Sequence, residues 1–410
     1  MTTPRKPSSS IVLIADKFSH RGVEALRGLV GEVVYQPGLK AQDLPAALAE
    51  TRASILVVRS TEVTQDALCA GERLSLVIRA GAGVNTIDLA TASDRGVFVA
   101  NCPGKNAIAV AELTMGLMLA LDRQLVDATS ELRQGTWNKK KYGAGRGLKG
   151  QRLGLVGFGM IGREVAQRAR AFALEIQVYE PAGVDHELAE RYGVSAAPDL
   201  ETLLRTSDIV SLHVPYSTAT HHLIGRAELA LMRSRAALIN TSRGGVVDDA
   251  ALTDAVKEGR VRAGLDVFED EPAGGHAPFD SPLMRYPDVY ATPHIGASTA
   301  EAAQAIAAEV VHIIRGYVLE GVVHNAVNVI TDRDAPFTLV VRHLDRVGVL
   351  AGVLAALREE EVNVQDMHNV IFTRGEAACA TITLESRPSP ELLTRLREAD
   401  EAILAVDLRG

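Results

Sequence analysis

Short apolar runs alternate with amphipathic stretches of helical spacing through most of the chain. Such alternation is typical of βαβ units, which place parallel strands in one sheet. The runs fall into two series, and each series predicts one parallel α/β domain. The predicted strands are residues 11–15, 32–35, 54–58, 76–79 and 97–100 in the first series, and residues 153–156, 176–179, 209–213, 237–240, 262–266 and 289–291 in the second.

The pattern changes after residue 328. Residues 331–335 are polar, and the remainder reads strand, helix, strand, strand, helix, strand. This order predicts a small α+β module with an antiparallel sheet and two helices on one face. The predicted strands are residues 337–342, 362–370, 377–384 and 403–408, and the predicted helices are residues 348–360 and 390–399.

A glycine-rich segment lies between the predicted strand 153–156 and a helical stretch at 163–172. Glycines allow a tight turn and a close approach of the backbone to a ligand. The free N–H groups at a helix start then attract the negative charge of a pyrophosphate. The spacing therefore predicts a dinucleotide site. The residues expected to contact the cofactor here are Gly157, Gly159, Met160, Ile161 and Gly162.

Glu180 directly follows the predicted strand 176–179. A carboxylate at this place can accept hydrogen bonds from both hydroxyl groups of an adenosine ribose. Residues 181–183 are Pro, Ala and Gly, so no arginine or lysine directly follows Glu180 to compensate the charge of a 2′-phosphate. We therefore expect NAD rather than NADP as the cofactor.

Composition limits the classes of partner. The chain has 410 residues, of which 47% are hydrophobic and 23% charged, and its formal net charge is −8. An acidic chain is a poor general binder of nucleic acid. The widely spaced Cys69, Cys102 and Cys379 form no metal-ligand pattern and favour a reducing compartment. The apolar run 11–15 is too short for a signal sequence or a membrane span, so we expect a cytoplasmic protein without nucleic-acid or membrane partners.

Three polar loops follow predicted strands of the second series, at residues 240–245, 266–272 and 292–296. Ligands of doubly wound sheets bind beyond the carboxyl ends of the strands, so these loops can converge on one site. Oxidation of a 2-hydroxy acid needs a guanidinium to hold the carboxylate, an imidazole to move the hydroxyl proton and a carboxylate to hold the imidazole. The loops supply Arg243, His294 and three candidate carboxylates, Glu269, Asp270 and Glu271.

In this order, behind a glycine loop, the three segments resemble those of the D-isomer-specific 2-hydroxyacid dehydrogenases. The resemblance implies that Arg243 binds the substrate carboxylate and carbonyl, and that His294 is the acid/base. It also selects Glu271, the residue before Pro272, as the support of the imidazole. Taken singly, an arginine before two glycines is more often a solvated turn residue, and a histidine after proline more often packs than catalyses. The ordered set favours catalysis.

The resemblance also implies a set of residues around the cofactor. Asp266 could simply cap a turn, but its counterpart in the family lies near the nicotinamide. His213, His221 and His222 lie close together in sequence, yet no carboxylate or cysteine has matching metal-ligand spacing, so we expect no metal. The implied cofactor-binding residues beyond the glycine segment and Glu180 are His213, Val214, Pro215, Thr241, Ser242, Arg243, Asp266, His294, Gly296 and Ala297.

Candidate substrate-binding residues lie in the first series. Arg59 and Ser60 follow the predicted strand 54–58, again at a carboxyl end, and suit an anionic substrate. Ala82 and Gly83 lie in a loop whose small residues allow the backbone to approach a substrate carboxylate. Arg243 and His294 complete the predicted substrate site.

Lys139 begins a run of three lysines shortly after Trp137, inside a chain that is acidic overall. A charge run of this kind is usually a solvated loop. Family members that act on a phosphorylated substrate place a basic residue after the corresponding tryptophan. The resemblance therefore implies that Lys139 contacts a substrate phosphate.

Residues 344–350, followed by 362–364, are similar to an ACT module, a small amino-acid-sensing domain. The resemblance implies that His343, Asp345 and Asn363 contact a serine effector between modules of two subunits. This sequence departs from the pattern in two places: Asp345 stands where serine-inhibited relatives have an amide, and Val347 stands where proline is usual.

Two helical patterns, residues 107–123 and 298–319, are longer than the others. Together with the resemblance, they predict that the chain crosses twice between two Rossmann-like or flavodoxin-like parallel-sheet domains with a cleft between them. The predicted domains are a discontinuous substrate-binding domain at 1–104 and 296–330, an NAD-binding domain at 105–295 and an ACT domain at 336–410.

Family members that end in one ACT module oxidise D-3-phosphoglycerate to 3-phosphohydroxypyruvate with NAD, the first step of phosphorylated L-serine biosynthesis. The resemblance implies this activity, with serine as a regulator, in a homotetramer or homodimer. One alternative is a reductase of glyoxylate, hydroxypyruvate or 2-oxoglutarate that uses the same site. Another is an NAD-sensing binding protein without catalysis.

Overall fold

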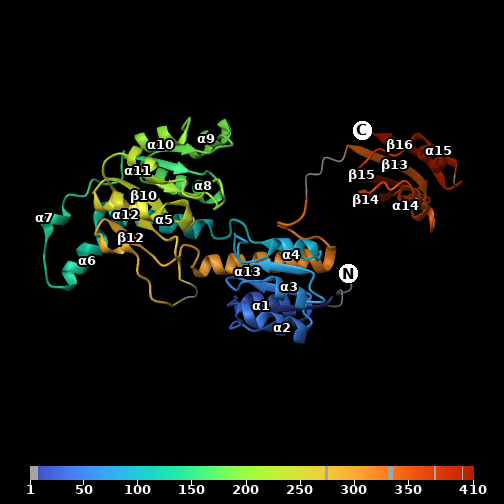
Figure 1. Cartoon of the computed structure of the whole chain (residues 1–410), viewed down its shortest axis with the longest axis horizontal. Coiled ribbons are helices and arrows are strands. Elements are labelled where there is room, and N and C mark those ends of the chain that lie inside the picture. The colour runs from blue at the N-terminus through green and yellow to red at the C-terminus, as the bar shows by residue number, and fades with distance from the viewer. Residues whose placement is uncertain (1–7, 273–275, 331–335, 374, 399) are drawn as a thin grey trace. The chain divides into compact units, whose positions relative to one another are not determined.

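The computed structural model describes residues 8–272, 276–330, 336–373, 375–398 and 400–410. The chain divides into two compact units, Met1–Val329 and Ile330–Gly410. Within the described residues the first unit holds two parallel sheets, and the second unit holds one antiparallel sheet (Figure 1). We call the two sheets of the first unit, with their helices, the first lobe and the second lobe.

The first lobe is a five-stranded parallel sheet in the order β2-β1-β3-β4-β5. The order is that of a doubly wound sheet, with α1 and α13 packed on one face and α2, α3 and α4 on the other. Its strands are β1 (Ser8–Ile14), β2 (Val30–Tyr35), β3 (Ile55–Val58), β4 (Leu76–Arg79) and β5 (Phe98–Asn101), and its helices are α1 (His20–Arg27), η1 (Ala41–Asp43), α2 (Leu44–Thr51), α3 (Gln65–Ala70), α4 (Leu89–Asp94) and α13 (Ala300–Glu320).

The second lobe is a seven-stranded parallel sheet in the order β12-β11-β10-β9-β6-β7-β8. Helices α5 and α8 cover one face, and α10, α11 and α12 cover the other. Its strands are β6 (Arg152–Val156), β7 (Glu175–Tyr179), β8 (Ser195–Ala196), β9 (Ile209–Leu212), β10 (Ala236–Asn240), β11 (Val261–Leu265) and β12 (Val289–Ala291). Its helices are α5 (Ala107–Arg123), α6 (Leu125–Arg133), α7 (Lys139–Tyr142), α8 (Met160–Ala171), α9 (His186–Tyr192), α10 (Leu200–Thr206), α11 (Arg226–Leu231), η2 (Gly244–Val246), α12 (Asp249–Lys257) and η3 (Pro282–Arg285).

The chain returns to the first lobe after completing the second (Figure 1). Helix α13 begins at Thr299, whose hydroxyl caps the N–H of Ala302, and ends at Gly321 in the left-handed conformation. Its buried apolar face packs against α1 and the first sheet. Beyond α13, Ala326 lies beside β5 and forms an antiparallel bridge with Ala100 of that strand. The first lobe therefore uses two separate stretches of sequence, and the exact domain boundaries stay a prediction.

Among the described residues, α13 is the one helix long and apolar enough to cross a membrane by length and composition. Its apolar side chains have another place in the fold, because Ile306, Val310, Ile313 and Ile314 are buried against the first sheet. A buried core helix meets the same two criteria, so the packing accounts for the composition.

The second unit is a four-stranded antiparallel sheet in the order β14-β15-β13-β16. Helices α14 and α15 share one hydrophobic core with the sheet. The predicted βαββαβ order is confirmed, whereas the ACT identity stays a prediction. The elements are β13 (Phe337–Leu344), α14 (Val349–Glu359), β14 (Val364–Ile371), β15 (Ala377–Leu384), α15 (Pro390–Glu398) and β16 (Ile403–Arg409).

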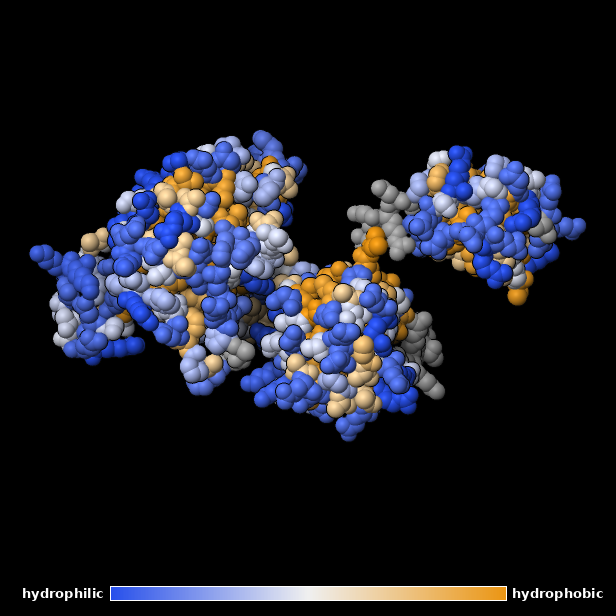
Figure 2. Space-filling model, in the orientation of Figure 1, coloured by the Kyte–Doolittle hydropathy of each residue, from blue (hydrophilic) through white to orange (hydrophobic). Residues whose placement is uncertain are grey.

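The predicted α/β class is confirmed, and each predicted strand is present with bounds shifted by two or three residues at most. The sequence pattern missed β8, because two exposed residues carry no apolar run. Met160 and Ile161 belong to the first turn of α8 rather than to the preceding turn. On the face that Figure 2 shows, hydrophilic residues cover most of the surface, as expected when the apolar side chains are buried in the cores.

Candidate active site

A pocket of about 1320 Å³ in the first unit is lined by loops of both lobes. It lies beyond the carboxyl ends of the second-lobe strands, where doubly wound sheets bind ligands. Most of the residues predicted from the sequence are brought together here. Those that line the pocket are Ser60, Ala82, Gly83, Ile161, His213, Val214, Pro215, Thr241, Ser242, Arg243, Asp266, Glu271, His294, Gly296 and Ala297.

His294 and Glu271 form a hydrogen-bonded pair at the pocket. His294 Nδ1 lies 2.6 Å from Glu271 Oε2, which assigns a proton to Nδ1 and leaves Nε2 for a ligand. The other carboxylate oxygen, Oε1, accepts the N–H of Phe268 over 3.1 Å. The pair can hold an imidazole in one orientation and stabilise its charged form.

The environment of Glu271 favours its ionised form. Partial burial would raise the pKa of Glu271, but the hydrogen bond from His294, the N–H of Phe268 and the charge of Arg243 outweigh it. The pKa of Glu271 is therefore lowered, and the carboxylate is charged at neutral pH. A charged partner is what an imidazole needs to accept a proton during a reaction.

Asp266 holds the segment that carries His294. Its carboxylate accepts the N–H groups of Ile295 and Gly296, over 2.9 and 2.8 Å, and the hydroxyl of Thr292 over 2.5 Å. His294 itself adopts a φ of +51°, and its N–H donates to the Asp266 carbonyl oxygen over 2.8 Å. These bonds explain how a non-glycine residue is kept in the left-handed region. Asp266 is 2% exposed, so positioning is its visible role, and a contact with the cofactor stays a prediction.

Arg243 is positioned by Asn240 at the end of β10. The Asn240 amide donates to the Arg243 carbonyl oxygen over 2.9 Å, and its oxygen accepts the N–H and hydroxyl of Ser242. The guanidinium lies against the first lobe, because a Cβ on Gly83 would be 3.1 Å from Arg243 Nη2. Arg243 therefore joins the two walls of the pocket.

Arg79, at the end of β4, is a pocket residue that the sequence reasoning missed. Burial and the charges of Arg243 and Arg59 together lower the pKa of its guanidinium. Its Nε has no hydrogen-bond partner among the described residues. Gly81 makes room for this side chain, since any Cβ there would collide with Nη1. One signal in the sequence could have pointed to it. Arg79 is a charged residue at the end of an otherwise apolar strand, and it therefore lies at the carboxyl edge of the sheet.

Arg59 and Ser60 are held by Asp16 at the end of β1. The Asp16 carboxylate accepts the N–H groups of Arg59, Ser60 and Thr61 over 2.7, 3.1 and 3.0 Å. Burial acts to raise the pKa of Asp16, but these N–H groups outweigh it and lower the pKa. Because Asp16 uses these N–H groups, an anionic ligand here would depend on side-chain cations.

The glycine segment fits the pyrophosphate of a dinucleotide. Gly157 has φ +94°, and a Cβ there would be 2.6 Å from the carbonyl oxygen of His213. A Cβ on Gly162 would collide with the Gly157 carbonyl oxygen, whereas a Cβ on Gly159 would meet open space. Gly159 precedes the 12-residue helix α8, whose first N–H groups are available to an anion.

Glu180 lies beside this segment, as predicted. Its Oε2 accepts the N–H of Phe158 over 2.9 Å, so the carboxylate is fixed at the turn between β6 and α8. Its free lone pairs suit ribose hydroxyl groups. The structure thus brings the glycine turn and the acidic residue together, which is the arrangement that an NAD site requires.

His213 follows β9 at the point where strand order reverses between β6 and β9. Its Nε2 lies 2.9 Å from the hydroxyl of Ser211, and its Nδ1 has no partner within the described part of the chain. Burial lowers the pKa of His213 to about 3, so the ring is neutral. No group of three or more His, Cys, Asp or Glu side chains within the described residues could hold a metal.

Lys139 does not reach the pocket in this chain. It belongs to α7, which with α6 extends from the second lobe (Figure 1), and it is exposed. Its neighbour Lys141 pairs with Glu131 over 2.7 Å. A contact between Lys139 and substrate of the same chain has no support in this geometry.

The candidate effector residues lie in the second unit. His343 is 1% exposed, with Nδ1 2.8 Å from the Leu344 carbonyl oxygen and Nε2 3.3 Å from Asn369 Oδ1. The Asn363 amide donates to Glu385 over 3.1 Å, and Asp345 is exposed. Asp345 and Asn363 are therefore open to a ligand, whereas His343 is not.

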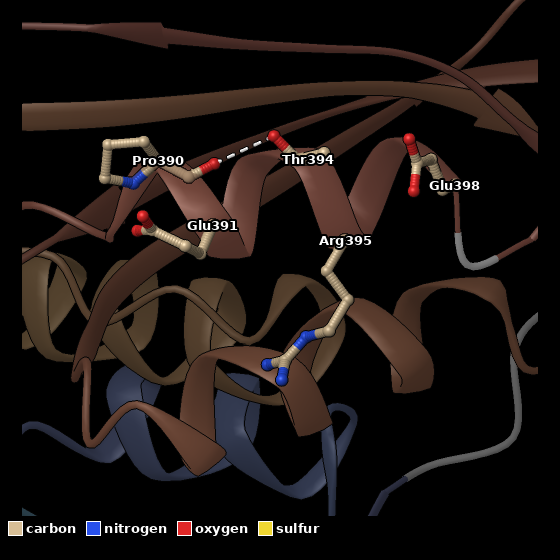
Figure 3. A pocket seen from close by; sticks show the side chains of 5 residues that line it. All are labelled: Pro390, Glu391, Thr394, Arg395 and Glu398. Carbon is tan, nitrogen blue, oxygen red and sulfur yellow. Dashed lines mark hydrogen bonds between the residues drawn. The ribbon is translucent and has the colours of Figure 1, made fainter.

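A second pocket, of about 560 Å³, lies on α15 in the second unit (Figure 3). Its five lining residues all belong to that helix, and in Figure 3 Arg395 extends away from Pro390 and Glu391. Arg395 pairs with Glu359 over 3.2 Å. One helix surface does not enclose a ligand, so the first-unit pocket is the functional candidate.

Comparison with known proteins identifies the family. Residues 115–296 match the domain described as "D-isomer specific 2-hydroxyacid dehydrogenase, NAD binding domain". The chain is 46% identical over 265 residues to the hydroxypyruvate reductase of Thermotoga maritima, covering 63% of this chain and 83% of that protein. The chain belongs to the D-isomer-specific 2-hydroxyacid dehydrogenase family. The family match confirms the prediction that NAD is the cofactor.

Other relatives differ in the activity that their names give. The chain is 41% identical over 319 residues to the D-3-phosphoglycerate dehydrogenase of Methanocaldococcus jannaschii, which covers 76% of this chain. The match spans only 59% of that relative's length. The crystal structure of a glyoxylate reductase from Paecilomyes thermophila has a TM-score of 0.70 at 28% identity, covering 78% of this chain and 99% of that one.

Proposed function

We propose that the protein oxidises D-3-phosphoglycerate to 3-phosphohydroxypyruvate with NAD. One observation carries the proposal: the His294–Glu271 pair lines the same pocket as two guanidinium groups, those of Arg79 and Arg243, and the charge of Arg59 also acts on Arg79. Guanidinium groups gathered around a buried arginine repel it and are costly unless an anion binds between them. A substrate with both a carboxylate and a phosphate supplies that compensation.

Arg243 binds the carboxylate and carbonyl oxygens of the substrate through its planar donors. His294 Nε2 takes the hydroxyl proton, and Glu271 stabilises the imidazolium that forms. NAD, when bound, supplies the hydride acceptor. Asp266 and Asn240 keep the two reactive side chains in place. In the reverse direction His294 starts charged and returns the proton.

The phosphate would bind at the first-lobe wall. Arg79 has an unsatisfied Nε, and Arg59 and Ser60 lie on the neighbouring segment. The N–H groups of residues 59–61 are already occupied by Asp16. Charge from guanidinium groups is therefore expected to dominate phosphate recognition.

The alternative is reduction of an unphosphorylated 2-oxo acid by the same site, as the names of the Thermotoga and Paecilomyes relatives indicate. Purified protein is assayed for NADH formation from D-3-phosphoglycerate and for NADH oxidation with hydroxypyruvate, glyoxylate and 2-oxoglutarate. The proposal expects the highest kcat/KM with the phosphorylated pair. A preference for an unphosphorylated acid would replace it with the alternative.

Arg79→Met sharpens this test. The variant keeps the length of the side chain without its charge, so KM for D-3-phosphoglycerate should rise about 10-fold or more, the scale of a lost charge-assisted bond. The KM values for unphosphorylated acids should change little. Arg95→Met, an exposed arginine at the end of α4, is the matched control.

The second unit supports a regulatory proposal: it is an ACT domain that binds L-serine and inhibits the reaction. Its βαββαβ order and the exposed Asp345, which can pair with an ammonium group, are the supporting observations. Calorimetric titration of the whole protein with L-serine, with D-serine as control, is the test. Absence of binding and of inhibition at millimolar serine would remove the proposal.

We also propose a homotetramer or homodimer in a cytoplasmic setting. Large apolar side chains are exposed on α6 and beyond it, at Leu125, Val126, Leu132 and the 80% exposed Trp137. Such a group is more easily explained by a second copy of the chain than by contact with water. Light scattering of wild type and Trp137→Ser checks the assembly.

A further inference from the structure

A second histidine–carboxylate pair lies beside the catalytic one. His222 Nε2 is 2.5 Å from Glu269 Oε1, and Glu269 precedes Glu271 by two residues in the same loop. The proposed chemistry uses neither residue. His222 follows β9, whereas Glu269 follows β11, so the pair joins two loops of the pocket.

The same carboxylate reaches a third loop. Glu269 Oε2 accepts the N–H of Asp249 over 3.2 Å, and the Glu269 N–H donates to Asp249 Oδ2 over 3.1 Å. His222 adopts a φ of +50°, and its own N–H donates to the Gly245 carbonyl oxygen over 2.8 Å. Gly245 lies in the segment that joins Arg243 to α12, and Asp249 is the first residue of α12. The loops after β9, β10 and β11 are thus bonded into one unit.

This unit is in direct contact with Glu271. A Cβ on Gly244 would collide with the Phe268 carbonyl oxygen, so the Arg243 loop and the Glu271 loop touch through their backbones. The Phe268 N–H then donates to Glu271 Oε1. A shift of the 268–271 segment would therefore move the carboxylate that holds His294.

We propose that His222 is a positioning residue: through Glu269 it fixes the 268–271 segment and keeps the Glu271 carboxylate against His294 Nδ1. The kinetic part of this inference rests on the proposed function. An ion pair as open as His222–Glu269 adds little to global stability, so its effect should appear locally and in catalysis.

The charges around His222 support this assignment. Glu269, Asp248 and Asp249 face the ring, Asp270 lies near Asp249, and His221 stacks on His222 with ring centroids 3.9 Å apart. The hydrogen bond to Glu269 is the main reason that the pKa of His222 is raised. The charged form of the ring, which this hydrogen bond favours, offsets carboxylates that would otherwise push the two loops apart.

Two variants of His222 distinguish loss of the contact with Glu269 from the mere replacement of the histidine. His222→Asn tolerates the left-handed backbone but cannot reach Glu269, and His222→Gln keeps a long side chain with an N–H donor. Arg226→Gln is the matched control, because it removes an exposed pair with Asp254 that joins α11 to α12 without touching the pocket loops. Glu269→Gln should behave like His222→Asn if the charge matters.

Hydrogen–deuterium exchange of the whole protein without substrate is the first readout. We expect faster exchange of the peptide containing residues 266–271 in His222→Asn, a smaller change in His222→Gln and none in Arg226→Gln. Global stability of all three should match wild type. Unchanged exchange in His222→Asn would overturn the inference, whether or not the protein is a dehydrogenase.

Kinetics is the second readout. His222→Asn should lower kcat about 10-fold with KM for the hydroxy acid unchanged, since substrate contacts remain. The acid limb of kcat/KM should move to lower pH by about half a unit, because the imidazolium at His294 loses part of its carboxylate support. A fall in kcat with an unmoved pH profile would contradict the positioning role. Failure of wild type to oxidise any 2-hydroxy acid would instead count against the proposed function.

Discussion

His294 Nδ1 and Glu271 Oε2 lie 2.6 Å apart, although 23 positions separate the two residues and each belongs to a different loop. His294→Gln removes the proton acceptor, so kcat should fall on the order of 10²–10⁴-fold. NADH affinity, followed by fluorescence titration, should change less than about threefold. His312→Gln, a histidine on α13 outside the pocket, is the control and should retain full activity.

Asp266→Asn tests how the His294 segment is held. The amide keeps one oxygen but loses the charge that accepts the N–H groups of Ile295 and Gly296, which should cost about 1.5–3 kcal/mol of unfolding free energy. Urea unfolding measures the loss, and kcat should fall with it. Asp288→Asn removes an exposed pair with Arg235 at the other end of β12 and should do neither. Wild-type stability in Asp266→Asn would mean that the segment holds its conformation by other means.

The raised pKa of Asp249 predicts that the free energy of unfolding depends on pH. Burial, with the charges of Glu269 and Asp270, raises the pKa of Asp249 from 3.8 to about 6. A raised carboxyl pKa means that the folded state binds the proton more tightly than the unfolded state, so stability falls as pH rises from about 4 to 6 and is level above. Asp249→Asn should therefore raise Tm at pH 7.5 and leave it almost unchanged at pH 3.5. Asp254→Asn, on the same helix but paired with the exposed Arg226, is the matched control.

Glu180 predicts the cofactor preference. Glu180→Gln keeps an acceptor for the Phe158 N–H but loses the charge, so NAD should bind about 10-fold more weakly and the preference over NADP should narrow. Calorimetric titration with both nucleotides measures this. Glu175→Gln, at the other end of β7, should bind both as wild type does. An unchanged ratio of NAD to NADP affinity in Glu180→Gln would exclude the ribose contact.

The parts of the fold that repeat were predictable from the sequence. Central strands such as β3 and β9 are buried on both faces, so they appear as uninterrupted apolar runs. The glycine segment and Glu180 were predictable for a related reason, because backbone geometry at a pyrophosphate site restricts the residue types. The placement of Arg243, Glu271 and His294 depended on the family resemblance, since Glu269 and Asp270 are chemically equivalent candidates.

Long-range partners were not predictable. Nothing in the neighbourhood of Asp266 in sequence indicates that its carboxylate will hold residues 292–296, because that contact exists only after β11 and β12 pair. Arg79 was hidden as the last residue of an apolar strand. His222 was considered only as a metal ligand, and its actual partner, Glu269, is 47 positions away.

The return of α13 to the first lobe affects how the protein can fold during synthesis. Val12, Ile14 and Ile78 on the first sheet are covered by residues near Val310 and Ile314, which leave the ribosome only after the whole second lobe has been made. During synthesis the second lobe can therefore fold before the first lobe is complete, although the first lobe begins earlier in the chain. Of the two lobes, the one whose sheet is translated first is completed second, and that sheet depends on protection from aggregation until α13 has emerged.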